Sequence, residues 1–235
     1  MKHCFSLAFV VVGVALVATP LVAAEKPAKQ PSPPAPLPKG EGSKTTAVKD
    51  LFDGKTLAGW KSSDFGGDGK LYVKDGAIVM ERGGSMTGIT WTGKPPRSNF
   101  ELPLDGMRLE GSDFFCTTTF PVGKEYCTLV VGGWGGTVVG LSNVDHYDAS
   151  ENSTTSSHEF KDNVWYHIRI RVTDAKIQAW IGNSEVVKQE REGHTFGIRI
   201  ECDASRPLGV STWNTKGAVK NLRLRELTAE EVKDE

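Results

Sequence analysis

The sequence predicts an all-β fold, an antiparallel β-sandwich built from many short strands. Apolar residues recur with a period of two, rather than 3.6, over most of the chain after residue 50. Turn sequences rich in glycine, proline and asparagine separate these runs, and no segment before Thr228 has the spacing of a long amphipathic helix. Two sheets packed face to face would bury the apolar faces of such strands.

The N-terminal residues predict an exported protein. Residues 1–24 contain an apolar run, Phe5 to Ala18, and small residues before position 25, which is the pattern of a secretory signal peptide; a membrane anchor is the alternative. We therefore expect a secreted or periplasmic protein with no transmembrane span in the mature chain. Residues 25–49 contain six prolines and predict an extended tether or a disordered leader. The sandwich domain is expected at 50–227, followed by a polar C-terminal tail at 228–235.

The charge of the chain narrows the classes of partner. The formal net charge is −1 at pH 7, whereas proteins that bind nucleic acid present a basic face. The chain also lacks a Gly-x-Ser-x-Gly elbow, a phosphate-binding glycine loop and a His-Glu-x-x-His zinc motif. We therefore expect no nucleic-acid partner and none of these three chemistries.

The strands can be placed in order along the chain. In "LFDGKTLAGWK", Leu51 to Lys61, Trp60 is expected in the core and Asp53 in a turn. Asp75-Gly76 predicts a hairpin that pairs Leu71 with Met80. Further strands are expected at 100–104, 113–120, 127–131, 137–141, 165–172, 176–181, 185–187, 196–201, 209–212 and 218–227. In the strand at 165–172, alternation places Ile168 and Ile170 in the core and Arg169 and Arg171 on the exposed face.

Four segments resemble, in the same order, the 3-keto-disaccharide hydrolase domain family. They are "LFDGKTLAGWK", "LYVKDGAIVM", "WYHIRIRVTDAKIQAWIGNSEVV" and "RPLGVSTWNTKGAVKNLRLREL". The resemblance implies a concanavalin-like, laminin-G-like jelly roll and a secreted, carbohydrate-directed domain acting on 3-keto glycosides as a hydrolase or lyase. Members usually carry a Tyr-Glu-Val-Gln strand in mid-domain, but residues 136–141 contain neither Glu nor Gln. This departure favours the alternative of a non-catalytic glycan-binding module; an envelope structural protein is a third hypothesis.

A polar stretch from Ser142 to Phe160 contains the candidate catalytic residues. Removal of the acidic proton beside a ketone requires a base, and His146 or His158 is the candidate. Asp148 and Glu151 are candidates for the acid or for metal ligands. With Asp145 they offer oxygen ligands of the kind that a divalent cation such as calcium prefers. The alternative is a solvated loop rich in turn-forming residues.

Three further residues are candidates for binding a carbohydrate. Trp134 lies between two Gly-Gly pairs, which could display its ring to a sugar or turn it into the core at a bulge. Trp180 falls on the polar face of its strand by alternation. Asp113 precedes an apolar run and could face the same site. We expect Trp134 and the polar loop that follows it to share one site.

The cysteine spacing predicts a disulfide. Phe120-Pro121-Val122-Gly123 has the form of a type I turn, and a two-residue loop there would place Cys116 opposite Cys127. Because disulfides are typical of secreted proteins, we expect these two to be joined and Cys202 to be free.

Overall fold

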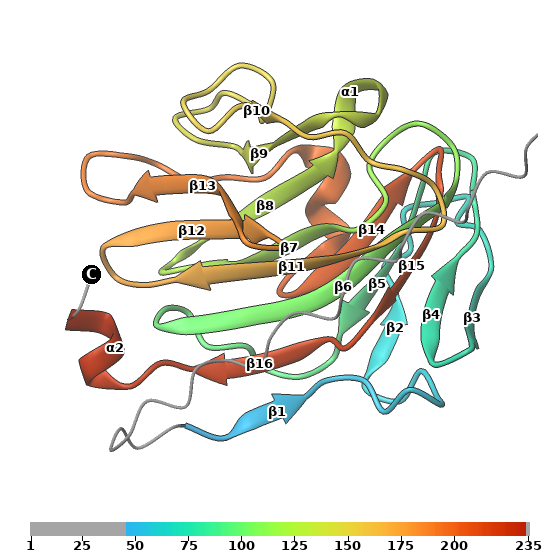
Figure 1. The fold of residues 1–235 in the computed structure, drawn as a ribbon, viewed down its shortest axis with the longest axis horizontal. Coiled ribbons are helices and arrows are strands. Elements are labelled where there is room, and N and C mark those ends of the chain that lie inside the picture. The colour runs from blue at the N-terminus through green and yellow to red at the C-terminus, as the bar shows by residue number, and fades with distance from the viewer. Residues whose placement is uncertain (1–45, 234–235) are drawn as a thin grey trace, which may run out of the picture. The chain divides into compact units, whose positions relative to one another are not determined.

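The described residues, 46–233, form two antiparallel β-sheets packed face to face (Figure 1). The fold is taken from a computed structural model. The prediction of an antiparallel β-sandwich is confirmed. The predicted signal peptide and almost all of the predicted tether lie outside the described residues, so the domain boundaries stay predictions.

In the described part of the chain, one sheet has nine strands. Seven follow one path, in the order β13 (Ser184–Glu190), β12 (Lys176–Ile181), β11 (Trp165–Val172), β6 (Phe100–Glu110), β15 (Lys216–Lys220), β4 (Ala77–Met80) and β3 (Leu71–Lys74). β16 (Arg223–Glu226) pairs with β6, and β1 (Val48–Asp50) pairs with β16. The first and last strands of the domain therefore lie side by side (Figure 1).

The second sheet has seven strands within the described range. Their order is β10 (Ser156–Ser157), β9 (Val138–Ser142), β8 (Glu125–Gly132), β7 (Thr117–Val122), β14 (Gly209–Trp213), β5 (Met86–Trp91) and β2 (Trp60–Ser62). Three short helical segments complete the domain: α1 (Gly133–Gly136), the 3₁₀ helix η1 (Ile200–Ser205) and α2 (Ala229–Lys233).

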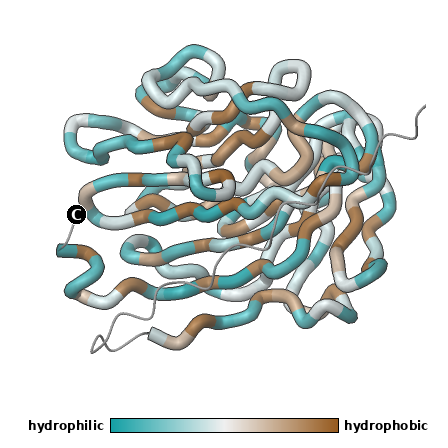
Figure 2. Tube along the Cα trace, in the orientation of Figure 1, coloured by the Kyte–Doolittle hydropathy of each residue, from teal (hydrophilic) through white to brown (hydrophobic). Residues whose placement is uncertain are grey.

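Alternation along the strands produces the core. In β11, Ile168 and Ile170 are fully buried, and the same alternation of apolar and polar residues is visible along β11 and β12 in Figure 2. The hairpin of β3 and β4 has the predicted register, with Leu71 opposite Met80. Its turn needs positive φ angles, which Asp75 and Gly76 supply at 50° and 75°.

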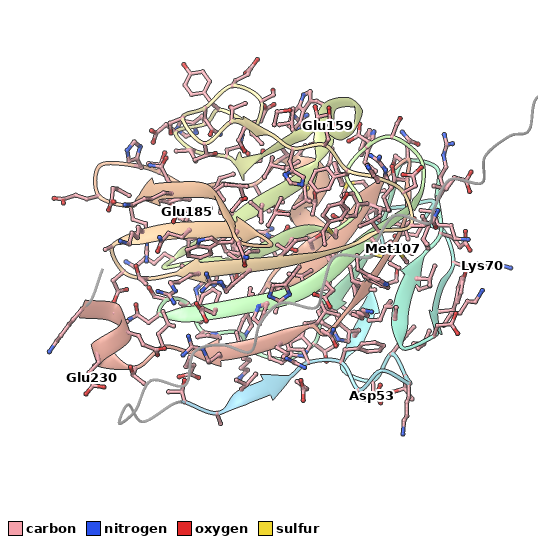
Figure 3. The ribbon with its side chains drawn as sticks, in the orientation of Figure 1. Asp53, Lys70, Met107, Glu159, Glu185 and Glu230 are labelled. Carbon is pink, nitrogen blue, oxygen red and sulfur yellow. The ribbon has the colours of Figure 1, made fainter. Side chains whose placement is uncertain are left out.

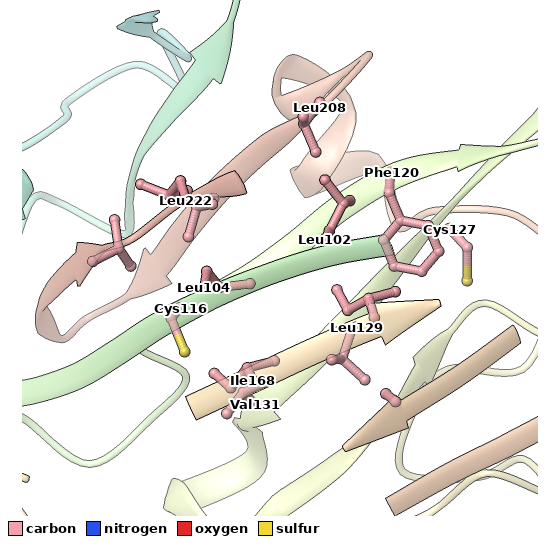
Figure 4. Close-up of a cluster of buried hydrophobic side chains, with 14 of the residues drawn as sticks. Leu102, Leu104, Cys116, Phe120, Cys127, Leu129, Val131, Ile168, Leu208 and Leu222 are labelled. Atoms are coloured by element: carbon pink, nitrogen blue, oxygen red, sulfur yellow. The ribbon is translucent and has the colours of Figure 1, made fainter. Parts of the chain in front are cut away.

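The main core is a cluster to which both sheets contribute (Figure 4), and a smaller cluster lies around Val79 and Ala218. Trp60 is buried as predicted, and its indole Nε1 donates a hydrogen bond to the Leu51 carbonyl at 2.8 Å. Asp53 forms the predicted turn at the surface (Figure 3): its carboxylate accepts hydrogen bonds from the backbone N–H groups of Lys55 and Thr56.

The predicted exposure of Arg169 and Arg171 is wrong. They lie on the outer face of the nine-stranded sheet as alternation requires, but both are half-buried because they pair with the buried carboxylate of Glu101. Arg225 reaches the same carboxylate from β16 at 2.6 Å. A residue on the polar face of a strand is therefore not necessarily exposed.

Three strand predictions also need correction. The strand predicted at 113–120 begins only at Thr117, as β7. The segment predicted as a strand at 196–201 makes one isolated bridge at Phe196 and then enters η1. The alternation of apolar residues in this segment does not indicate which of them are buried, because Ile200 is 87% exposed. The segment predicted as one strand at 218–227 is interrupted by Asn221, whose φ of 53° ends β15 before β16 begins.

The predicted disulfide is wrong because the hairpin turns later than expected. β7 continues through Pro121 to Val122, so Phe120 pairs with Cys127, and the turn falls at Gly123 and Lys124. Cys116 and Cys127 are free and buried, and their sulfur atoms lie at separate places in the core (Figure 4). Cys202 is also free and buried.

None of the helices in residues 46–233 is long and apolar enough to cross a bilayer.

Candidate functional site

The outer face of the seven-stranded sheet is polar and partly covered. Phe120 on β7, Cys127 on β8 and Leu141 on β9 point into the core. Because side chains alternate along a strand, their immediate neighbours on each strand point outward. The outward set consists mainly of hydroxyl residues: Thr90, Thr117, Thr119, Thr128, Ser142 and Ser211. η1 packs over β5 and β14, where the Thr90 hydroxyl donates to the Ala204 carbonyl at 2.9 Å.

Beside η1 this face contains a pocket of about 240 Å³. Its floor comes from strands of the sheet, and its walls come from α1, from the segment before β7 and from η1 with the residue before it. The lining residues are Met86, Asp113, Phe114, Thr117, Thr128, Val130, Trp134, Ser142, Arg199, Glu201, Cys202 and Trp213. A concave site with apolar walls and a few polar groups is the usual form of a small-molecule site.

Three aromatic rings line the pocket. Phe114 and Trp213 lie with their ring centres 6.2 Å apart, and Trp134 comes from α1. Trp134 is 43% exposed, so its ring is displayed rather than buried in the core. The glycines make this possible, because the turn needs positive φ angles at Gly132, Trp134, Gly135 and Gly136, and glycine adopts such angles without strain.

Asp113 fixes the position of the Trp134 turn. Its carboxylate accepts hydrogen bonds from the backbone N–H of Phe114 at 2.8 Å and of Gly135 at 3.3 Å. Asp113 thus links the segment before β7 to α1, and it also lines the pocket. The structure therefore brings the predicted binding residues Trp134 and Asp113 together.

An arginine between two carboxylates forms the polar wall. Arg199 contacts Asp148 at 2.7 Å and Glu201 at 3.0 Å, and its guanidinium lies 6.0 Å from the centre of the Trp134 ring. The hydrogen bond from Arg199 lowers the pKa of the Glu201 carboxyl, and the same bond raises the pKa of Arg199. Both groups are therefore charged at neutral pH.

The floor of the pocket contains a hydroxyl without a partner. Ser142 is 1% exposed, and its Oγ has no hydrogen-bond partner among the described residues. Buried polar side chains are usually hydrogen-bonded, so this hydroxyl is available to a ligand. Cys202 lies nearby in the wall, where burial raises the pKa of its thiol to about 12 and keeps it protonated.

The predicted catalytic histidines lie outside this pocket. His146 is exposed on the loop after β9, and it does not line the cavity. His158 packs against Phe160 and Tyr166, with ring centres 4.6 and 5.8 Å away, and burial lowers its pKa. Glu151 is exposed on the same loop, so of the four predicted catalytic residues only Asp148 reaches the pocket wall, through Arg199.

The predicted metal site at Asp145, Asp148 and Glu151 does not form. Among residues 46–233 no group of three His, Cys, Asp or Glu side chains is placed to hold a metal ion. The carboxylates are used separately: Asp145 bonds His194 and Thr195, and Asp148 bonds Ser150 and Arg199.

The loop is organised around an amide. The side-chain nitrogen of Asn152 donates to the carbonyls of Leu141, Tyr147 and Asp148, and its oxygen accepts from Thr154. These hydrogen bonds lie within the loop, as expected of a loop rich in turn-forming residues.

Trp180 belongs to the other sheet. It lies on the outer face of β12, and the Arg169 guanidinium stacks 3.9 Å from the centre of its ring. Its predicted role in substrate binding therefore concerns a surface separate from the pocket.

Sequence reasoning missed four of the residues that line the pocket. Arg199 and Glu201 lie inside the segment predicted as a strand at 196–201, and Phe114 lies inside the strand predicted at 113–120. Ser142 is the last residue of β9 and the first of the polar stretch. No local pattern brings these residues together, because the path of the chain over the sheet decides which of them meet.

The fold and the pocket define the class of protein: an antiparallel β-sandwich domain with a concave site, lined by hydroxyls, aromatic rings and carboxylates, on the outer face of one sheet. Residues 47–225 match the model of the 3-keto-alpha-glucoside-1,2-lyase-like domain, and the chain belongs to that family. A search of curated proteins found no match.

Solved structures share the fold at low sequence identity. A candidate glycosyl hydrolase from Parabacteroides distasonis ATCC 8503 has a TM-score of 0.51 and 15% identity, covering 77% of this chain and 94% of its own. The apo Crh5 transglycosylase has a TM-score of 0.55 and 12% identity, covering 78% of this chain and 85% of its own. At these identities the likeness concerns the fold alone.

Proposed function

We propose that this domain binds a saccharide in the pocket on the outer face of the seven-stranded sheet. The observation that carries the proposal is the meeting of Trp134 and Trp213 with the carboxylates of Asp113 and Glu201 in one cavity. The C–H faces of a sugar ring can pack on aromatic rings, and its hydroxyls can donate to carboxylates. Family membership supports a carbohydrate as the ligand.

A second candidate function is elimination on a 3-keto glycoside, the chemistry that the family description indicates. The carbon beside a ketone carries an acidic proton; a base removes it, and the electron pair then expels the glycosidic oxygen, which takes up a proton. Asp113 and Glu201 are the carboxylates that line the pocket, so one of them is the proposed base. His146 and His158 would act only if the loops that carry them moved.

We also propose that the protein is exported to the periplasm or the medium. The support is the signal-peptide pattern of residues 1–24. N-terminal sequencing of the protein isolated from its native host tests this, because cleavage after Ala24 would leave Glu25 as the first residue.

The binding proposal predicts a difference between two tryptophans. Trp134→Ala should weaken binding by roughly 1–3 kcal/mol, by analogy with aromatic stacking on bases. It should leave the melting temperature nearly unchanged, because the side chain is 43% exposed. Calorimetric titration with sucrose, α,α-trehalose, maltose and cellobiose, and with their 3-keto derivatives, measures the affinity.

Trp180→Ala is the matched control, because it removes the same side chain from the other sheet. It should leave affinity unchanged. If it weakened binding while Trp134→Ala did not, the ligand face would be the nine-stranded sheet. Turnover of a 3-keto derivative that Asp113→Asn or Glu201→Gln abolishes would support the elimination; an absence of turnover by the unmodified protein would leave a binding module.

A further inference from the structure

We infer that the pocket selects neutral saccharides and rejects those that carry a carboxylate or sulfate, because its basic side chain is already held between two acids. The inference rests on the proposed saccharide site and adds the charge class of its ligand. Of the described residues that line the pocket, Arg199 alone is basic, whereas Asp113 and Glu201 are acidic.

The guanidinium of Arg199 is occupied on two sides. One terminal nitrogen lies 2.7 Å from an Asp148 oxygen, and the other lies 3.0 Å from a Glu201 oxygen. Its Nε also approaches Glu201, at 3.4 Å. An acidic sugar would have to displace one of these carboxylates before it could pair with Arg199, and the displaced carboxylate would lose its partner.

The net charge of the pocket lining is negative. Two carboxylates and one guanidinium give the lining a formal charge of −1, and Asp148 behind Arg199 makes it −2. Two like charges about 4 Å apart in water repel enough to weaken binding about fivefold, and the effect grows as the surroundings become less polar. An anionic ligand is therefore opposed by the wall, whereas a neutral one is not.

The floor complements a neutral ligand. The Ser142 hydroxyl is buried without a partner, and Thr117 and Thr128 line the cavity beside it. A hydroxyl can both donate and accept, which matches the hydroxyls of a sugar. Thr117 accepts a bond from the Val131 N–H and Thr128 bonds Thr119. Of these three hydroxyls, only that of Ser142 has no hydrogen-bond partner among the described residues.

The test compares two ligands that differ by one charge. The neutral ligand is whichever of sucrose, α,α-trehalose, maltose and cellobiose binds best; the acidic one is the same disaccharide with a hydroxymethyl group oxidised to a carboxylate. The unmodified protein should bind the neutral ligand at least about fivefold more tightly. Added salt should improve binding of the acid and leave the neutral ligand unaffected, because salt screens charge.

Two variants should change the ratio of the affinity for the neutral ligand to that for the acidic ligand, in opposite directions. Glu201→Gln removes a negative charge and releases one side of Arg199, so the preference for the neutral ligand should fall about fivefold. Arg199→Gln removes the positive charge, so the preference should rise. Asp148→Asn should act like Glu201→Gln without altering the pocket lining, and Glu192→Gln, an exposed residue outside this pocket, should have no effect.

The outcomes separate the inference from the proposed function. Equal affinity of the unmodified protein for the two ligands would overturn the inference and leave the saccharide site standing. The same would follow if Asp148→Asn and Arg199→Gln, both folded by circular dichroism, moved the ratio in one direction. Failure of all four neutral disaccharides and their 3-keto derivatives to bind would overturn the proposed function itself.

Discussion

At the scale of single residues, Glu101 is the buried carboxylate on which three arginines of the nine-stranded sheet converge. It is 2% exposed and accepts hydrogen bonds from Arg169, Arg171 and Arg225. Burial alone would raise the pKa of its carboxyl, but the hydrogen bond from Arg225 and the charge of Arg171 outweigh burial and lower it. The three arginines bring together β6, β11 and β16, which are distant in sequence.

Glu101→Gln should therefore destabilise the domain. Removal of one partner from a buried ion pair typically costs about 3–5 kcal/mol, because the opposite charges remain buried. Urea unfolding at pH 7 measures the loss. Glu110→Gln, an exposed change on the same strand, should cost under ~0.5 kcal/mol. Equal stability of the two variants would show that the arginine cluster contributes little.

The same residue predicts a pH dependence. Because the pKa of Glu101 is lower in the folded protein than the unperturbed value of 4.5, its contribution is present above that value. It is lost as the pH falls through the folded pKa. The free energy of unfolding should therefore decrease below about pH 4.5. The decrease should be smaller in Glu101→Gln, and identical slopes would contradict this assignment.

At the scale of elements, the β7–β8 hairpin decides the state of the cysteines. Its turn at Gly123 places Phe120 opposite Cys127, so Cys116 has no cysteine across from it. Burial raises the pKa of Cys127 to about 12 and the pKa of Cys116 well above its usual value. Both thiols are protonated and inaccessible in the folded protein.

The thiols of all three described cysteines should not react with Ellman's reagent in the native protein and should react after unfolding. Ellman's reagent should detect almost no thiol in the folded protein at pH 8. It should detect Cys116, Cys127 and Cys202 in guanidinium chloride without reductant. Detection of Cys202 alone after unfolding would restore the disulfide that the sequence predicted.

At the scale of the whole described domain, one core holds the two sheets together. Ile168 and Ile170 from the nine-stranded sheet belong to the same buried cluster as Phe120 and Leu129 from the seven-stranded sheet. A core shared in this way predicts that the sheets unfold together in one transition.

Ile170→Ala tests this cooperativity. Ile170 is fully buried, so the change should cost about 2–5 kcal/mol. Tryptophan fluorescence and far-ultraviolet circular dichroism should shift together during urea unfolding. Ile200→Ala makes the same substitution at a residue that is 87% exposed and should cost under ~0.5 kcal/mol. Separate transitions for the two probes would show that the sheets unfold independently.

The sequence alone determined the local features of this protein. Alternation assigned Ile168 and Ile170 to the core, Asp75-Gly76 set a hairpin and its register, and Trp60 was recognised as a buried anchor. These features depend on side-chain direction and on turn geometry within a few residues. The ordered motifs also indicated the family, to which residues 47–225 belong.

The tertiary structure decided which distant residues meet. Asp113, Trp134, Ser142 and Glu201 share a pocket, although up to 88 positions separate them in the sequence. Alternation assigns a residue to a face but does not say which loop crosses that face, so η1 and Arg199 were missed. The prediction of a disulfide was wrong for a related reason. A shift in the turn changes every pair of opposite residues along the hairpin, and the register of the hairpin depends on packing of the whole sheet.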